Sequence, residues 1–138
     1  MVNPSRWQQR YENFKLAKVK FDMANDAVKN DSKNELYCMA LIQTFECCYE
    51  LGWKVLKDFL NFQGEAVQLP RDVIKMAFSM GLLIDGDCWI LMLQDRNLTV
   101  HTYDQLKTTQ IISSIQTRYA DAFSSLIVKF DQLLLDND

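Results

Sequence analysis

Glycine and proline are scarce in this chain of 138 residues, which contains four glycines and two prolines. Because these two residues most often interrupt helices and strands, their scarcity predicts long, uninterrupted elements. No segment shows the strict apolar–polar alternation of a half-buried strand, and no internal repeat or low-complexity tract is visible. Apolar residues instead recur three or four positions apart. The sequence therefore predicts an all-α fold.

Long apolar runs are also missing. No stretch approaches the roughly 18 consecutive apolar residues of a membrane span, and the chain opens without the apolar core of a signal peptide. Apolar residues make up 49% of the sequence and charged residues 24%, which is typical of a folded soluble protein. We therefore expect a cytoplasmic protein that does not contact the membrane.

Positive charge and metal-binding patterns are equally limited. The formal net charge of -3 and pI near 5.1 argue against a broad basic surface for nucleic acid, so any RNA contact would have to be local. The sequence has one histidine, and its four cysteines lack the paired spacing of a zinc site. We expect no metal and no cofactor, and we interpret the cysteines as reduced core residues.

About five helices are predicted from apolar spacing and from residues that favour helix ends. Their short connections favour an antiparallel bundle of four-helix type, formed as one domain over residues 1–138. The fourth helix is apolar at nearly every position from 89 to 93, which places it at the centre of the bundle. The first helix follows Asn3-Pro4 and ends near residue 30; the second follows a capping box at 32–35 and ends before Gly64; the third covers 71–80; the fourth follows the turn at 85–87 and ends at Arg96; the fifth runs from after Thr102 to about Leu134.

Two features of the second predicted helix concern its surface. Glu46, Glu50 and Lys54 are spaced four residues apart, which is typical of a stabilising charge ladder on an exposed face. Gly52 costs about 1 kcal/mol relative to alanine inside a helix. Its presence suggests that a neighbouring helix or a dimer mate passes close to it.

The segment 95–104 carries more reactive side chains than any other. It contains an arginine, an amide, a tyrosine, two carboxylates and the only histidine. On one helix Arg96 and His101 would lie about 140° apart, but a capping box from Thr102 to Gln105 predicts a break between them. A guanidinium, an imidazole and a helix N-terminus in one corner would suit a phosphate. The simpler interpretation, in which His101 only caps or packs, stays open.

Four segments resemble, in order, the nucleotidyltransferase substrate-binding proteins of the HEPN superfamily, which include the HepT toxins of HepT/MntA toxin–antitoxin pairs. The resemblance covers nearly the whole chain, and the R-x4-H-x-Y motif of the family falls on Arg96, His101 and Tyr103. Val100 departs from the small polar residue expected at its position. The segments are FECCYELGWK at 45–54, PRDVI at 70–74, DGDCW at 85–89 and DRNLTVHTY at 95–103.

The resemblance implies a HEPN-like homodimer that assembles with a separately encoded minimal nucleotidyltransferase. It implies that Arg96 and His101 are the catalytic residues of a metal-independent endoribonuclease acting on RNA, with Asp95 and Asn97 in supporting roles. Tyr103 would be the hydroxyl to which the nucleotidyltransferase adds AMP, silencing the toxin. Asn97 could orient a phosphate or equally well cap the fourth helix.

Two other interpretations remain open. The chain could be a non-catalytic substrate-binding or regulatory subunit of a two-component nucleotidyltransferase, which its negative charge allows. It could also be a structural dimerisation domain in which Arg96 and His101 only hold two helix ends together.

Overall fold

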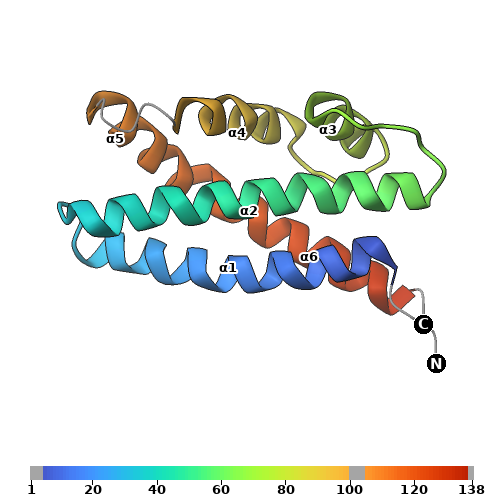
Figure 1. Cartoon of the computed structure of the whole chain (residues 1–138), viewed down its shortest axis with the longest axis horizontal. Helices are drawn as coiled ribbons and strands as arrows, with labels where there is room; N and C mark the ends of the chain where they lie inside the picture. Colours follow the sequence, from blue (N-terminus) through green and yellow to red (C-terminus); the bar gives the residue numbers. More distant parts are fainter. Residues whose placement is uncertain (1–4, 100–104, 137–138) are drawn as a thin grey trace.

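Two long antiparallel helices frame the computed structural model, which describes residues 5–99 and 105–136 (Figure 1). Helix α1 spans Arg6–Asn30, and helix α2 spans Glu35–Phe62. The side chain of Asn34 accepts a hydrogen bond of 3.1 Å from the backbone N–H of Tyr37, so Asn34 is the N-cap of α2. The capping box predicted at 32–35 is therefore wrong, because the cap lies two residues later and Glu35 is the first residue of the helix.

The start of α1 also lies later than predicted. Asn3 and Pro4 fall outside the described residues, and α1 begins at Arg6 after the N-cap Ser5. The backbone N–H of Ser5 donates to Gln8 Oε1 at 2.8 Å, which is one half of a capping-box arrangement.

Three further helices lie along the side of α2 that faces away from α1 (Figure 1). They are α3 (Pro70–Ser79), α4 (Gly86–Leu98) and α5 (Gln105–Ser114). Throughout the described ranges every regular element is helical, which confirms the all-α prediction. No helix in these ranges carries an apolar stretch long enough to cross a bilayer.

Local chemistry sets the boundaries of α3 and the start of α4 as predicted. Pro70 is the first residue of α3, where its missing N–H costs nothing. Gly81 follows that helix with a φ of 77°, a conformation that glycine adopts without steric cost. The carboxylate of Asp85 accepts a hydrogen bond of 3.0 Å from the N–H of Cys88 and so caps α4.

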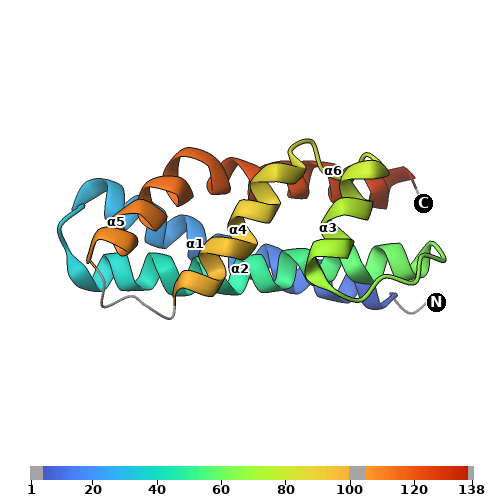
Figure 2. The same cartoon turned by 90° about the horizontal axis from the view of Figure 1, so that it is seen from above.

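The predicted final helix is interrupted by a wider turn. Helix α5 continues through a five-residue π-helix, η2 (Ile115–Tyr119), into α6 (Ala120–Asp136), and the N–H of Ala120 bonds to the carbonyl five residues back. This rod crosses α2 diagonally and ends beside α1 (Figures 1 and 2). Its buried residues at 111, 115, 119 and 123 are four apart, a spacing that drifts by about 40° per step around an α-helix. The π-turn compensates for that drift.

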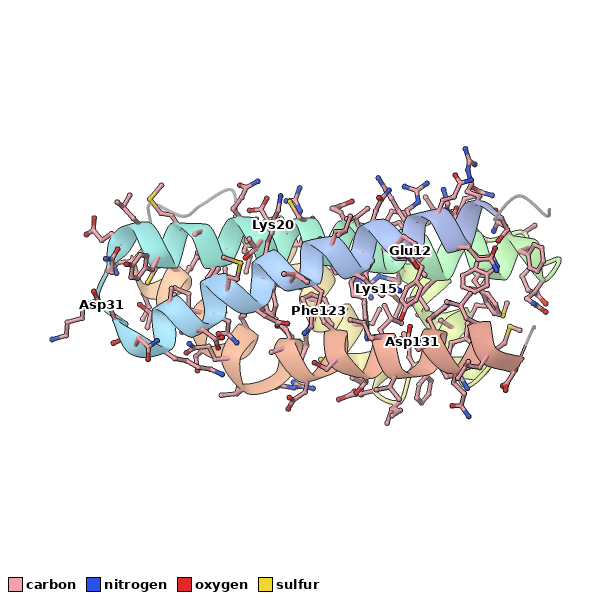
Figure 3. The ribbon with its side chains drawn as sticks, turned by 90° about the horizontal axis from the view of Figure 1, so that it is seen from below. Glu12, Lys15, Lys20, Asp31, Phe123 and Asp131 are labelled. Carbon is pink, nitrogen blue, oxygen red and sulfur yellow. The ribbon has the colours of Figure 1, made fainter. Side chains whose placement is uncertain are left out.

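Aromatic rings fill the space between α1, α2 and α6. The fully buried Phe123 lies between the ribbons of α1 and α6 in Figure 3. Edge-to-face ring pairs, which Phe123 forms with Phe14, Phe21 and Trp89, contribute about 0.5–1.5 kcal/mol each beyond simple burial. The ring centroid of Phe123 lies 6.0 Å from that of Phe14, 5.2 Å from Phe21, 6.2 Å from Phe45 and 5.9 Å from Trp89.

Helix α4 is an outer helix, so the prediction that it is central is wrong. Trp89 and Met92 are buried, but Leu91 is 37% exposed, and the helix lies over α2 in the outer layer (Figure 2). Apolar composition alone did not distinguish a central helix from one that buries a single face. Phe78 of α3, although apolar, is likewise 53% exposed.

Helices α2 and α4 approach closely at Gly52. A Cβ atom added there would lie 2.8 Å from Trp89 Cη2 and 3.3 Å from Phe14 Cε2. The Trp89 ring is 2% exposed and packs against Tyr49 and Phe123, so it has no space into which to move. The close neighbour that the glycine indicated is α4 of the same chain.

We predict that Gly52→Ala lowers the free energy of unfolding by about 1–3 kcal/mol, because the added methyl group overpacks the contact with Trp89. Helix propensity alone would instead raise the free energy of unfolding, by about 1 kcal/mol. Urea denaturation measures the difference, and Ala40→Gly on the exposed side of α2 serves as the control, with a loss of about 1 kcal/mol from propensity alone. A Gly52→Ala variant more stable than the parent would contradict the close approach.

The four cysteines are free thiols in different surroundings. Cys48 and Cys88 are buried as predicted, whereas Cys38 is half-buried and Cys47 is exposed. Burial raises the pKa of Cys48 to about 12 and that of Cys88 to about 11, from an ordinary value of 9.0. Both thiols therefore stay protonated in the folded protein at pH values where they ionise in the unfolded chain.

We predict that the free energy of unfolding falls as the pH rises above about 9, because the unfolded chain then releases thiol protons that the folded protein keeps. This stabilisation is fully present below the ordinary thiol pKa and is lost as the pH approaches the raised values. Denaturation under reducing conditions at several pH values measures the slope. Cys48→Ala should flatten it, and Cys47→Ser should leave it unchanged; equal slopes in all three proteins would contradict the assignment.

Candidate functional site

Arg96 lies in the last turn of α4 and faces two carboxylates of α2. Its Nε lies 3.5 Å from Glu50 Oε1, and its Nη1 lies 3.9 Å from Glu46 Oε2. The guanidinium side chain is 29% exposed, so it is accessible from one side. Glu46 and Glu50, predicted as part of a surface ladder, are partly exposed, and both also face this guanidinium.

The end of α4 supports the guanidinium. The hydroxyl of Thr99 donates to the carbonyl oxygen of Arg96 at 2.7 Å, and Arg96 Nη1 lies 3.5 Å from the same hydroxyl oxygen. Helix α4 ends at Leu98, two residues later than predicted, because Thr99 satisfies this terminal carbonyl. A cation in the last turn also interacts favourably with the negative end of the helix dipole.

The guanidinium is not saturated by these contacts. Among the described residues the buried Arg96 Nε has no hydrogen-bond acceptor, so its 3.5 Å contact with Glu50 is an ion pair only. Two carboxylates at this range orient the charge without using all five N–H donors of the group. Such a guanidinium can still bind an anion.

Asp95 contacts the last helix rather than the two glutamates. The hydroxyl of Tyr119, in η2, donates to Asp95 Oδ2 at 2.5 Å. Burial raises the pKa of Tyr119, and the hydrogen bond to Asp95 raises it further, so the hydroxyl remains a donor at neutral pH. Asn97 is exposed on α4. Asp95 and Asn97 were predicted to support the site, and that role stays a prediction. The structure adds that Asp95 is hydrogen-bonded to Tyr119.

His101 and Tyr103 lie outside the described residues, as do Val100 and the Thr102 end of the predicted capping box. The predicted convergence of Arg96 and His101 on one phosphate-sized space therefore stays a prediction.

A groove of about 950 Å³ lies beside the end of α4, and Glu46, Thr99 and Gln105 line part of it. Most of its other polar wall consists of uncharged hydroxyl and amide side chains. Within the described ranges, no three His, Cys, Asp or Glu side chains gather closely enough to hold a metal ion. The uncharged polar residues of the wall include Ser32, Gln43, Thr108, Thr109, Ser113, Gln116 and Thr117.

Sequence reasoning missed three partners of this site: Glu46, Glu50 and Tyr119. The two glutamates were recognised only as neighbours of each other on α2. The repeated four-residue spacing before Tyr119 was a usable signal of the π-turn, because an α-helix cannot keep such residues on one face for three steps.

We predict a small but measurable coupling between Arg96 and Glu50. A double-mutant cycle with Arg96→Ala and Glu50→Gln should give a coupling of about 0.5–1 kcal/mol in urea denaturation, because the pair is only partly screened by solvent. The pair Arg118–Asp85 is the control, since it has a similar separation of 3.3 Å but is more exposed. Equal coupling energies in the two cycles would show that the half-buried position of Arg96 does not strengthen its ion pair with Glu50.

Comparisons with known proteins support the family resemblance. Residues 9–132 match the family described as nucleotidyltransferase substrate binding protein like. The chain is 34% identical over 79 residues to the curated "Probable ribonuclease HepT" of Haemophilus influenzae, an alignment that covers 54% of each protein. The chain thus spans about half the length of this curated relative.

Two solved structures share the fold. A crystal structure of a protein from Thermus thermophilus has a TM-score of 0.65 and 29% identity, covering 79% of this chain and 97% of that one. The Haemophilus influenzae protein HI0074, described as the fold of a substrate binding domain of a nucleotidyltransferase, has a TM-score of 0.73 and 23% identity, covering 86% and 96%. The match over residues 9–132 shows that the chain belongs to the nucleotidyltransferase substrate-binding protein family.

Proposed function

We propose that the protein is a HepT-type toxin, a metal-independent endoribonuclease that a cognate minimal nucleotidyltransferase neutralises. The observation that carries the proposal is the partly exposed guanidinium of Arg96, held at the end of α4 by Glu50 and Glu46. His101 follows at the motif spacing of the family. The curated relative named as a probable HepT ribonuclease supports the same activity.

The proposed reaction needs two proton transfers and one stabilised phosphoryl group. The ribose 2′-oxygen forms a bond to phosphorus while the bond to the 5′-oxygen breaks, leaving a 2′,3′-cyclic phosphate and a 5′-hydroxyl. An imidazole titrates near neutral pH, so His101 suits the removal of the 2′-hydroxyl proton or the protonation of the 5′-oxygen. Because the chain has one histidine, we propose a homodimer that supplies one for each transfer.

Arg96 would stabilise the negative charge that builds on the phosphoryl oxygens. A guanidinium donates parallel hydrogen bonds to two oxygens of a phosphate, and such bonds strengthen in a site shielded from water. Glu46 and Glu50 would hold the group in position from one side, leaving the solvent-facing side for the phosphate. Asn97, exposed on the same turn, would contact the adjacent RNA backbone.

Modification of Tyr103 would explain how the partner silences the toxin. The residue lies two positions after His101, so an added AMP would bring a phosphate charge and a nucleotide beside the catalytic imidazole. An RNA phosphate would then meet repulsion and a steric block.

We predict that Arg96→Ala and His101→Ala each reduce RNA cleavage by at least about 100-fold, since each removes a group that acts in the transition state. Gel assays of purified protein with RNA and EDTA, together with growth arrest in cells, measure the loss. Arg118→Ala, which removes an exposed arginine elsewhere, should cleave like the parent. Unchanged cleavage in the His101 variant would disprove its catalytic role.

A second candidate function is a non-catalytic subunit that binds substrate for the nucleotidyltransferase or regulates it. Two carboxylates lie beside the one guanidinium of Arg96, in a chain of net charge -3. This negative charge weakens the attraction of the site for RNA phosphates and favours this alternative. Purified protein would then leave RNA intact while still accepting AMP from its partner.

We predict that incubation with the nucleotidyltransferase, ATP and magnesium increases the intact mass of the chain by one AMP group per modified hydroxyl. Tyr103→Phe should abolish the increase, because the acceptor oxygen is gone. Tyr37→Phe removes another exposed phenol and should be modified normally. An AMP adduct that persists in the Tyr103 variant would place the modification elsewhere.

A further inference from the structure

We propose that Tyr119 is a positioning residue for Arg96, acting through its hydrogen bond to Asp95, and that the π-turn η2 places its hydroxyl for this purpose. The proposal rests on the proposed ribonuclease function and assigns a role to residues outside the family motif.

Tyr119 is itself held firmly. It is 1% exposed, and its ring stacks on Phe45 of α2 with centroids 5.4 Å apart and planes 16° from parallel. From that fixed ring the hydroxyl reaches Asp95 of α4. One rigid side chain therefore connects the last helix, α2 and α4 at the level of the guanidinium.

The two neighbouring residues on α4 attach it to different helices. Successive side chains of an α-helix point about 100° apart, so Asp95 faces Tyr119 while Arg96 faces Glu50 and Glu46. An anchor on each side limits rotation of the last turn about its own axis. With the Asp95 anchor removed, Arg96 would be held from one side only.

The anchor matters because burial holds this end of α4 weakly. Of the residues from 93 to 99, only Thr99 is buried, so few apolar contacts fix the orientation of the turn. The hydrogen bond also engages the Asp95 carboxylate. Without it, the last turn of α4 would lose its hydrogen bond to η2.

The π-turn accounts for the direction of Tyr119. Along an unbroken α-helix the steps from 111 to 115 to 119 would carry residue 119 about 80° away from the line of residue 111. The wide turn keeps both buried on the inner side, where Tyr119 meets Phe45 and Asp95. π-turns are uncommon inside α-helices and often occur at functional sites.

The test compares two tyrosines that lose the same kind of bond. Tyr119→Phe keeps the ring and removes the hydroxyl. Tyr11→Phe is the matched control, because the buried Tyr11 hydroxyl donates to Asp131 at 2.6 Å and to the Ile127 carbonyl, between α1 and α6 (Figure 3 labels Asp131). Both variants should lose some stability.

Well below the melting temperature, Tyr119→Phe should lower kcat for RNA cleavage by roughly tenfold or more with little change in KM, because a misplaced guanidinium stabilises the transition state poorly. Tyr11→Phe should cleave like the parent. Asp95→Asn keeps an oxygen that accepts from Tyr119 and should retain most of the activity, whereas Asp95→Ala should behave like Tyr119→Phe.

A second measurement does not depend on cleavage. The NMR signal of the Arg96 Nε–H, identified by its loss in Arg96→Lys, should shift or broaden in Tyr119→Phe and stay in place in Tyr11→Phe. An unchanged signal in Tyr119→Phe overturns the inference, as does full kcat in that variant or an equal loss in both tyrosine variants. Parent protein that leaves RNA intact while the signal still responds to Tyr119→Phe would reject the ribonuclease function and keep the positioning role.

Discussion

The packing of Trp89 onto Gly52 is the contact on which the candidate site depends. Without a side chain at residue 52, the indole of α4 reaches the backbone of α2 and brings the two helices together. Trp89 and Arg96 are seven residues apart, close to two helical turns, so they share the face of α4 that meets α2. Helices α2 and α4 run in opposite directions. The residues of α2 that lie opposite Arg96 therefore precede Gly52 in the sequence, and they include Glu50 and Glu46. The aromatic contact thereby places the guanidinium opposite its carboxylates.

Polar anchors, rather than burial, hold the end of α4 that carries Arg96. The ion pairs of Arg96 are partly exposed, and pairs of this kind contribute about 0–1 kcal/mol. A hydrogen bond to a charged acceptor, such as that from Tyr119 to Asp95, contributes about 1.5–3 kcal/mol. These energies are small beside those of the aromatic core, but they are directional. They determine where side chains point more than whether the chain folds.

The opposite end of the bundle uses similar pairs without any reactive neighbour. Arg10 of α1 donates to the buried carboxylate of Asp58 on α2 at 2.9 Å, and Tyr11 donates to Asp131 of α6. These contacts fix α1 against its two neighbours. The two tyrosine–carboxylate bonds differ in what lies next to the carboxylate, which at Asp95 is Arg96 of the candidate site.

The sequence by itself determined the helical class, the two ends of α3, the start of α4 and the motif that led to the family, because each depends on residues close together in the chain. Pro70, Gly81 and Asp85 act through their own backbone or the next turn, so their roles were predictable. Only the tertiary structure decided that α4 is an outer helix, that Glu46 and Glu50 face Arg96, and that Tyr119 meets Asp95. Those pairings join residues far apart in sequence, and they follow from the packing distance between helices and the rotation of each about its axis, which apolar spacing along one helix does not specify.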